Sequence, residues 1–400
     1  MTADRTGRIF LASLWALLAL AALEFLMRVA IFPEYTAMFP ELYERHPVFV
    51  HVNKPNLNVR RFKAGNYDVV IHTNSMGFRG LERNRAAELK GVWVAGGSNT
   101  FGGYVGDDQV FAARLAAHGY PAANLASEGH NIAEQARIIR HLGDLGYRPR
   151  AVVMAITLFN AIQDYGDDWD ALTKPLDVPV EAPKAVHDRP RDRLVAAAEG
   201  VRTSVPTSLR DLRSRLAKSS ALYGWLKDGI IGIPALRDWT LKLGLRDDLD
   251  FRFPGRLGVD VLRPLTKGNR AMTLIDSTAE LTAAVGAMVE RRFGVPFGVV
   301  LLPSHHQIHP ASFQRYLKHM GLAGQDLDAL RALDALAGAL RARGVATLDT
   351  LPALRAAKVK RLTFPDDGHL VAAGHAIVAE ALARWLDTGM GSGRPIAKAP

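Results

Sequence analysis

Short apolar runs recur along the chain and alternate with longer segments in which apolar residues return every three or four positions. The short runs are strand-like and occupy residues 67–72, 92–95, 122–125, 151–156, 297–302 and 345–348. The helical patterns cover residues 111–118, 132–145, 278–293, 327–343 and 370–386. Strands joined by helices of this length need crossover connections, which build a parallel sheet covered on both faces. The pattern predicts an α/β fold, a three-layer α/β/α sandwich with a mostly parallel five-stranded sheet, over residues 66–170 and 270–387.

The longest apolar run lies near the N-terminus, over residues 9–32. As a helix it would span about 36 Å, enough to cross a bilayer with some tilt. Glu24 and Arg28 interrupt the run, but their i, i+4 spacing lets them pair on one helix face. Arg5 and Arg8 precede it and favour a cytoplasmic N-terminus. We therefore predict a transmembrane anchor over residues 1–33 and a periplasmic or otherwise extracytoplasmic catalytic domain; a cleaved signal peptide and a buried helix are the alternatives.

Three further segments break the strand–helix rhythm. Residues 34–65 are polar and punctuated by proline, which predicts a loop-rich neck. Residues 171–269 begin proline-rich and continue into basic helical patterns, so they form an insertion between the third and fourth sheet strands. The insertion is either a solvated surface excursion or a lid that recruits substrate. Residues 388–400 are rich in Gly, Pro and Ala, which predicts a disordered tail.

Composition narrows the class of partner. The 400 residues carry a formal net charge of +10, which favours anionic surfaces such as lipid headgroups or acidic glycans. The basic residues are dispersed rather than interleaved with aromatic ones, so we expect no nucleic acid partner. The chain has no cysteine, which excludes disulfides, thiolate metal sites and cysteine nucleophiles. Nothing in the pattern predicts an oligomeric state.

Polar residues follow the predicted strands at their carboxyl ends, where parallel α/β sheets bind ligands. They include Ser98 after the first sheet strand, Gly129 after the second and Asn160 after the third. Acyl transfer needs a hydroxyl, an imidazole base and donors for the oxyanion. Ser98 and His369 supply the first two, and Asp366, three residues before His369, can orient the imidazole. The N–H groups of Ser98 and Gly129 and the amide of Asn160 are the candidate donors. Asn99 and Thr100 are interpreted as cap and packing residues.

These residues, in this order, resemble the SGNH (GDSL-type) hydrolase family. Residues 73–80 and 367–375 are similar to the flanking segments of its membrane-anchored bacterial members, and the likeness covers residues 66–169 and 295–386. The resemblance implies a serine nucleophile at Ser98, oxyanion donors at Ser98, Gly129 and Asn160, and a His369 base with Asp366 as its partner. It implies no cofactor. The chain departs from the family at Gly97, where the family has Asp, and at Ala161, where it also has Asp; Asp367 is an alternative to Asp366.

Two other motifs invite competing interpretations. His305, His306 and His309 follow the fourth sheet strand, but adjacent histidines project apart and no carboxylate stands nearby, so we expect substrate contact by His305 or His306 rather than a metal site. Gly96-Gly97-Ser98 could be a nucleotide-phosphate loop, but it lacks a P-loop lysine. We therefore predict a membrane-tethered serine esterase or O-acyltransferase acting on an O-acylated glycan or lipid-linked substrate. The alternative is a non-catalytic glycan-binding or assembly module with the same fold.

Overall fold

The computed structural model describes most of the chain outside the insertion. The described residues are 2–31, 42–46, 49–63, 66–158, 162, 220–223, 225–226, 233, 236, 258–266, 269–319, 321–359, 361–364, 368–391 and 395–398. They divide into two compact units, which we describe separately. One comprises Met1–Leu42, Val59–Val69 and Arg202–Arg246, and the other comprises Tyr43–Asn58, Val70–Val201 and Asp247–Pro400.

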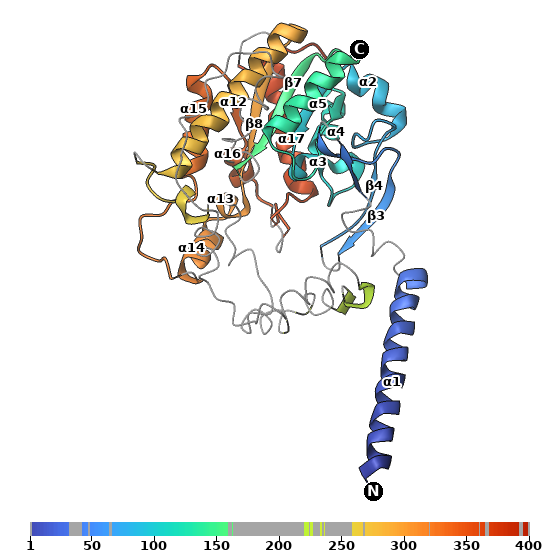
Figure 1. Ribbon diagram of the computed structural model, residues 1–400. Helices are drawn as coiled ribbons and strands as arrows, with labels where there is room; N and C mark the ends of the chain where they lie inside the picture. The colour runs from blue at the N-terminus through green and yellow to red at the C-terminus, as the bar shows by residue number, and fades with distance from the viewer. Residues whose placement is uncertain are drawn as a thin grey trace. The chain divides into compact units, whose positions relative to one another are not determined.

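The larger unit is built on one parallel sheet (Figure 1). Its five strands run in the spatial order β6-β5-β7-β8-β9, and every neighbouring pair is parallel. Their bounds are β5 Val92–Gly96, β6 Ala122–Asn124, β7 Ala151–Thr157, β8 Phe297–Leu302 and β9 Ala346–Asp349. The predicted α/β class with five parallel strands is confirmed. Strands β5 to β8 are apolar because most of their side chains are buried on both faces.

Helices pack on this sheet and against one another. Helix α12 (Arg270–Phe293) packs against α5 (Ile132–Asp144), α15 (Arg331–Ala342) and strand β8, whereas α17 (Ala372–Asp387) packs against α4 (Phe111–Arg114) and α16 (Leu351–Ala356). Trp93 of β5 is fully buried. Its ring lies edge-on to Phe293 at 5.3 Å, and its indole N–H donates to the carbonyl of Leu89, at the end of α2 (Arg85–Leu89), over 2.9 Å. Burying such a side chain contributes about 2–3 kcal/mol to the stability of the core.

The expected loop-rich neck differs from the structure. Tyr43–His46 (β1) and Val50–Asn53 (β2) form an antiparallel hairpin, and Asn58–Lys63 (β3) pairs with Tyr67–His72 (β4). The hairpin is held by distant residues, since Asn53 Nδ2 donates to the carbonyls of Gly77 and Ala126, both at 3.0 Å. Contacts across 24 and 73 residues leave no local pattern, so proline and polar residues alone predicted a loop here.

The tail also differs from the prediction of disorder, over residues 388–391 and 395–398. Ile396 is buried, and its N–H donates to the carbonyl of Leu386 over 3.1 Å. Arg150 Nη1 donates to the carbonyls of Ala397 and Lys398 at 3.0 and 2.6 Å. The Gly, Pro and Ala content gave no indication that Ile396 is buried or that the carbonyls of Ala397 and Lys398 accept hydrogen bonds.

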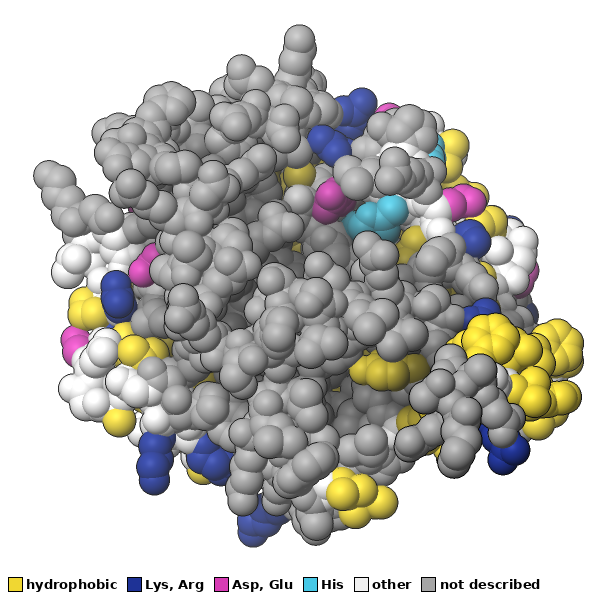
Figure 2. Space-filling view, turned by 60° about the horizontal axis from the view of Figure 1, so that its bottom comes forward, with side chains coloured by type: hydrophobic (Ala, Val, Ile, Leu, Met, Phe, Trp, Pro, Cys, Tyr) yellow, Lys and Arg dark blue, Asp and Glu magenta, His cyan; other side chains and the backbone are white. Residues whose placement is uncertain are grey.

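The smaller unit contains the N-terminal helix α1 (Thr2–Leu26), continued by a π-helical turn over Met27–Ile31. Gly7–Ala30 is long and apolar enough to cross a membrane, with a mean hydropathy of 2.2. The exposed apolar side chains of α1 form the hydrophobic cluster at the right of Figure 2. Arg28 Nε donates to Glu24 Oε1 over 2.7 Å, which confirms the predicted i, i+4 pair.

Candidate active site

Ser98 stands at the first position of a short helix that follows the carboxyl end of β5. Helix α3 (Ser98–Phe101) begins after Gly97 and ends at Gly102, whose left-handed φ of +69° only glycine adopts at low cost. The turn also needs Gly96, since a Cβ there would lie 2.0 Å from Thr100 Oγ1 and 3.0 Å from the Ala155 carbonyl. The small residues of this turn therefore place the Ser98 hydroxyl at the edge of the sheet.

His369 meets Ser98 from a loop 271 residues further along the chain. His369 Nε2 lies 2.7 Å from Ser98 Oγ, a hydrogen bond in which the hydroxyl can donate to the ring nitrogen. Backbone bonds close the loop: Phe364 N donates to the His369 carbonyl at 2.8 Å, and Gly368 N donates to the Phe364 carbonyl at 3.1 Å. The serine and the imidazole are thus held in the geometry that lets a base take the hydroxyl proton.

The side chain of Asn99 links the helix that carries Ser98 to the loop that carries His369. Its Oδ1 accepts a hydrogen bond from the N–H of Leu370 at 3.0 Å, so the residue after Ser98 binds the residue after His369. Leu370 is buried and forms a β-bridge with Thr363, on the opposite side of the loop. The interpretation of Asn99 as a cap or packing residue is therefore incomplete, because its side chain docks the loop that carries His369.

Tyr104 contacts the imidazole, and His305 contacts the loop that carries it. The ring of Tyr104 lies 4.6 Å from that of His369, between centroids, and 6.1 Å from that of Phe364. His305 Nδ1 lies 2.6 Å from Thr363 Oγ1, which joins α13 (His305–Ile308) to the same loop. Tyr104 was not singled out from the sequence, because an aromatic residue after a glycine pair carries no local signal of its role.

The other two histidines of the motif at residues 305–309 make contacts within their own segment. His306 is 1% exposed, with its Nδ1 3.1 Å from Ser312 Oγ and its ring against Tyr316. The His305 and His309 rings are 4.8 Å apart between centroids. Among the described residues, no group of three His, Cys, Asp or Glu side chains is placed to hold a metal ion. Of the two predicted substrate contacts, His305 is therefore the one linked to the His369 loop.

Gly129 lies on the loop after β6, the strand directly beside β5. Its φ is +83° and the residue is exposed, while Glu128 and His130 on either side are buried. The hairpin holds this loop in place: His51 Nε2 lies 2.7 Å from the Glu128 carbonyl, and His130 Nε2 lies 2.9 Å from the His51 carbonyl. Burial lowers the pKa of His130 to about 4, so the His130 side chain is neutral at pH 7.

The buried side chain of Arg79 packs against the helix that begins at Ser98 and forms an ion pair with the half-buried Asp107. Arg79 is 3% exposed, lies over the Phe101 ring at 5.5 Å and is 3.1 Å from Asp107 Oδ1. Its Nη2 also donates to the Val105 carbonyl at 2.8 Å, and Asp107 Oδ2 is 2.5 Å from His72 Nδ1. Segment 73–80, similar to a family segment in the sequence, thus braces α3.

His375 lies near His369 but is buried in the core. It is 1% exposed, accepts a hydrogen bond from Phe111 N at Nδ1 over 3.3 Å, and stacks on the Phe111 ring. Burial, with a smaller contribution from the positive charge of His369, lowers the pKa of His375 to about 3. His375 is therefore neutral at pH 7 and adds no positive charge beside His369.

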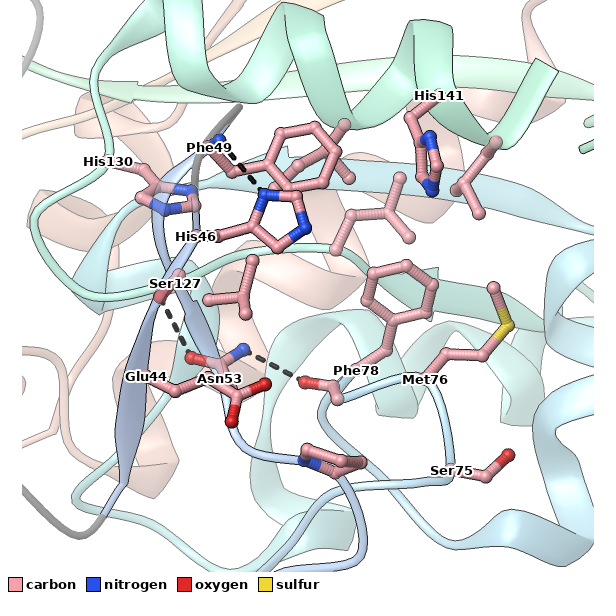
Figure 3. A pocket seen from close by; sticks show the side chains of 16 residues that line it. Glu44, His46, Phe49, Asn53, Ser75, Met76, Phe78, Ser127, His130 and His141 are labelled. Atoms are coloured by element: carbon pink, nitrogen blue, oxygen red, sulfur yellow. Dashed lines mark hydrogen bonds between the residues drawn. The ribbon is translucent and has the colours of Figure 1, made fainter. Parts of the chain in front are cut away.

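A separate pocket of about 260 Å³ lies beneath the β1–β2 hairpin (Figure 3). Its floor is apolar, with Leu125, Ile138 and Leu142 buried, and the rings of His46, Phe49 and His141 run along one wall. Asn53 and Ser127 line it as well, joined by a hydrogen bond of 2.9 Å. Neither Ser98 nor His369 lines this pocket, so it is separate from the pair that they form.

The predicted site residues therefore stand as follows. The structure brings Ser98 and His369 together and puts Gly129 on the strand end next to that of Ser98. Asn160 and Asp366 lie outside the described residues, as does the alternative Asp367. The chain order places a topological switch point between β5 and β7, where doubly wound sheets bind their ligands.

Comparison with known proteins adds no family. No protein-family model and no curated protein matches the chain. The chemical class of the site is therefore inferred from its own geometry.

Proposed function

We propose that the chain is a membrane-tethered serine esterase or O-acyltransferase that works through an acyl-Ser98 intermediate. The observation that carries the proposal is the 2.7 Å hydrogen bond between Ser98 Oγ and His369 Nε2 at the carboxyl end of a parallel sheet. A serine hydroxyl is a weak nucleophile at neutral pH unless a base takes its proton, and this pair supplies both groups. The finer fold proposed with it is the three-layer SGNH-type sandwich.

The reaction follows from this pair. Ser98 Oγ attacks the carbonyl carbon of an ester while the hydroxyl proton passes to His369 Nε2. This attack converts the ester carbonyl into a tetrahedral oxyanion. The N–H groups of Ser98 and Gly129 and the side-chain amide of Asn160 are the proposed oxyanion donors. When the intermediate collapses, the ester C–O bond breaks and the leaving alcohol takes the proton from His369. Asp366 is proposed to accept from the other ring nitrogen and hold the tautomer.

The second half of the reaction decides between hydrolysis and transfer. Water, or a hydroxyl of a sugar, gives its proton to His369 and attacks the acyl carbonyl, which releases Ser98. The proposed substrate is an O-acylated glycan or lipid-linked molecule, with His305 as a contact. The apolar helix α1 and the basic Arg5 and Arg8 in its first turns support a site outside the cytoplasm, tethered to the membrane.

The test uses a fluorophosphonate probe and a short p-nitrophenyl ester with the full-length protein. Ser98→Ala should abolish probe labelling and lower ester turnover by roughly 10⁴-fold or more. Ser75→Ala, at an exposed serine outside the site, is the matched control and should label like wild type. Labelling that persists in Ser98→Ala would overturn the nucleophile assignment. A wild-type protein that never labels but binds glycan would favour the non-catalytic module.

A further inference from the structure

A carboxylate near the end of the apolar helix binds a segment of the insertion. Glu24 accepts four hydrogen bonds: from Arg28 Nε at 2.7 Å, Ser220 Oγ at 2.8 Å, and the backbone N–H groups of Ala221 and Leu222, both at 2.9 Å. The three donors from residues 220–222 stand at the start of a short helical segment, so the carboxylate caps it. This contact lies within the smaller unit.

The depth of Glu24 along the helix gives the contact its meaning. Glu24 lies six residues before Ala30, the end of the apolar span, and thus about 9 Å inside it. A carboxylate at that depth is costly unless polar partners reach it. Met27, on the same helix face, is 3% exposed, whereas Phe25 and Val29 are 68% and 61% exposed. One face of the C-terminal end of α1 is therefore covered, and Ser220, Ala221 and Leu222 reach Glu24 at its depth in the apolar span.

The segment that reaches Glu24 also presents large apolar side chains outward. Trp225 and Leu226 are 45% and 49% exposed, directly after the residues that Glu24 caps. Ile233 and Leu236, further along the same unit, are 51% and 41% exposed. Tryptophan with aliphatic neighbours favours the membrane–water interface, where the ring is buried and the indole N–H stays hydrated. In water this exposed apolar surface would be unfavourable.

We infer that residues 220–223, with Trp225 and Leu226, form an interfacial foot, which Glu24 docks against the anchor and which inserts Trp225 and Leu226 into the headgroup region of the bilayer. The partner is the lipid surface itself, because the foot is continuous with a helix suited to span it. This inference rests on the membrane anchor of the proposed function and is independent of the esterase chemistry. The foot gives the insertion a role in holding the chain at the membrane surface.

The chain lacks cysteine, which permits single-site labelling of the full-length protein in liposomes. An environment-sensitive fluorophore is attached at Leu226→Cys, at Leu145→Cys in the sheet unit as a control of similar exposure, and at Leu17→Cys within the span. Nitroxide lipids labelled at the headgroup or deep in the acyl chain, and aqueous iodide, serve as quenchers. We expect headgroup nitroxide to quench the residue 226 probe, iodide alone to quench residue 145, and deep nitroxide to quench residue 17.

Glu24→Ala tests the docking itself. It should cause loss of nitroxide quenching at residue 226 and leave residue 17 unchanged, while Glu24→Gln, which keeps an acceptor oxygen, should retain part of the quenching. A residue 226 probe that behaves like residue 145 would overturn the foot and leave the anchor standing. A residue 17 probe in water would overturn both the anchor and the foot. Unchanged quenching at residue 226 in Glu24→Ala would overturn the role of Glu24.

Discussion

The hydrogen bond from Leu370 N to Asn99 Oδ1 offers a way to test how the proposed base is positioned without touching the reacting atoms. Asn99→Ala removes the acceptor and leaves the buried Leu370 N–H without its partner. A net hydrogen bond contributes about 1 kcal/mol, and an unsatisfied buried donor costs about 1–3 kcal/mol. The free energy with which the His369 loop docks should therefore weaken by at least about 1 kcal/mol.

The remaining contacts set the size of the effect. Phe364 N still donates to the His369 carbonyl at 2.8 Å, and Val371 N still donates to the Leu362 carbonyl at 3.0 Å, so the loop keeps its own shape. A loss of about 1 kcal/mol corresponds to a roughly fivefold change in an equilibrium. We therefore expect Asn99→Ala to slow acylation of Ser98 by about fivefold, far less than the roughly 10⁴-fold loss expected for Ser98→Ala.

The assay is the second-order rate of fluorophosphonate labelling, followed together with kcat and KM for a p-nitrophenyl ester. Asn99→Asp is the matched control, because its carboxylate keeps the acceptor for Leu370 N. Its negative charge also favours the imidazolium of His369, so the acidic limb of its pH–rate profile should move to higher pH while the rate at pH 8 is kept. An unchanged labelling rate in Asn99→Ala would refute the positioning role. A loss as deep as that of Ser98→Ala would show that Asn99 takes part in the chemistry.

Three other changes test the support around the site. In Gly129→Ala the new Cβ has room, but alanine must adopt a φ of +83°, which costs about 1–2 kcal/mol. We expect kcat/KM to fall with little change in KM. Wild-type turnover would argue against Gly129 as an oxyanion donor. Asp107→Asn leaves the buried Arg79 beside a neutral partner, so urea denaturation should show a loss of about 3 kcal/mol, and a loss below measurement error would contradict the buried pair. The pKa values of His375 and His130, lowered from 6.5 to about 3 and about 4, mean that the unfolded chain binds protons first as the pH falls. Unfolding free energy should be constant above pH 6.5 and fall below it by up to about 1.4 kcal/mol per pH unit for each histidine, and a flat profile between pH 7.5 and 5.5 would refute this.

The sheet could be predicted from sequence because its information is local. Buried parallel strands read as continuous apolar runs between polar residues, and all five sheet strands lie within one residue of their predicted bounds, with Phe297–Leu302 matching at both ends. The amphipathic pattern of α5 predicts that helix equally well, and the Asn131 cap fixes its N-terminus. Helix α12, by contrast, begins at Arg270, eight residues before the predicted start. The parallel direction of the sheet strands followed from these two periods, and so did the edge at which the candidate site residues gather.

What escaped prediction depends on contacts that the chain makes with distant residues. Nothing in the sequence indicated that Arg79 and Asp107 form an ion pair, yet Arg79 lies over the ring of Phe101 in the helix that begins at Ser98. Composition cannot reveal such a pair, because burial of an ion pair is decided by the elements that close over it.

The approach of Ser98 and His369 joins the two kinds of information. Sheet topology brings strand ends to one edge, and so it explains why a serine after β5 and a histidine before α17 lie in the same region. It does not explain a separation of 2.7 Å, because a loop has many ways to cross that edge. The side chain of Asn99 selects one of them by binding the N–H next to His369, and this choice depends on an amide that stands beside the nucleophile. The position of His369 against Ser98 therefore depends on the side chain of Asn99 as well as on the order of the strands, and Asn99→Ala tests that dependence without changing either residue of the pair.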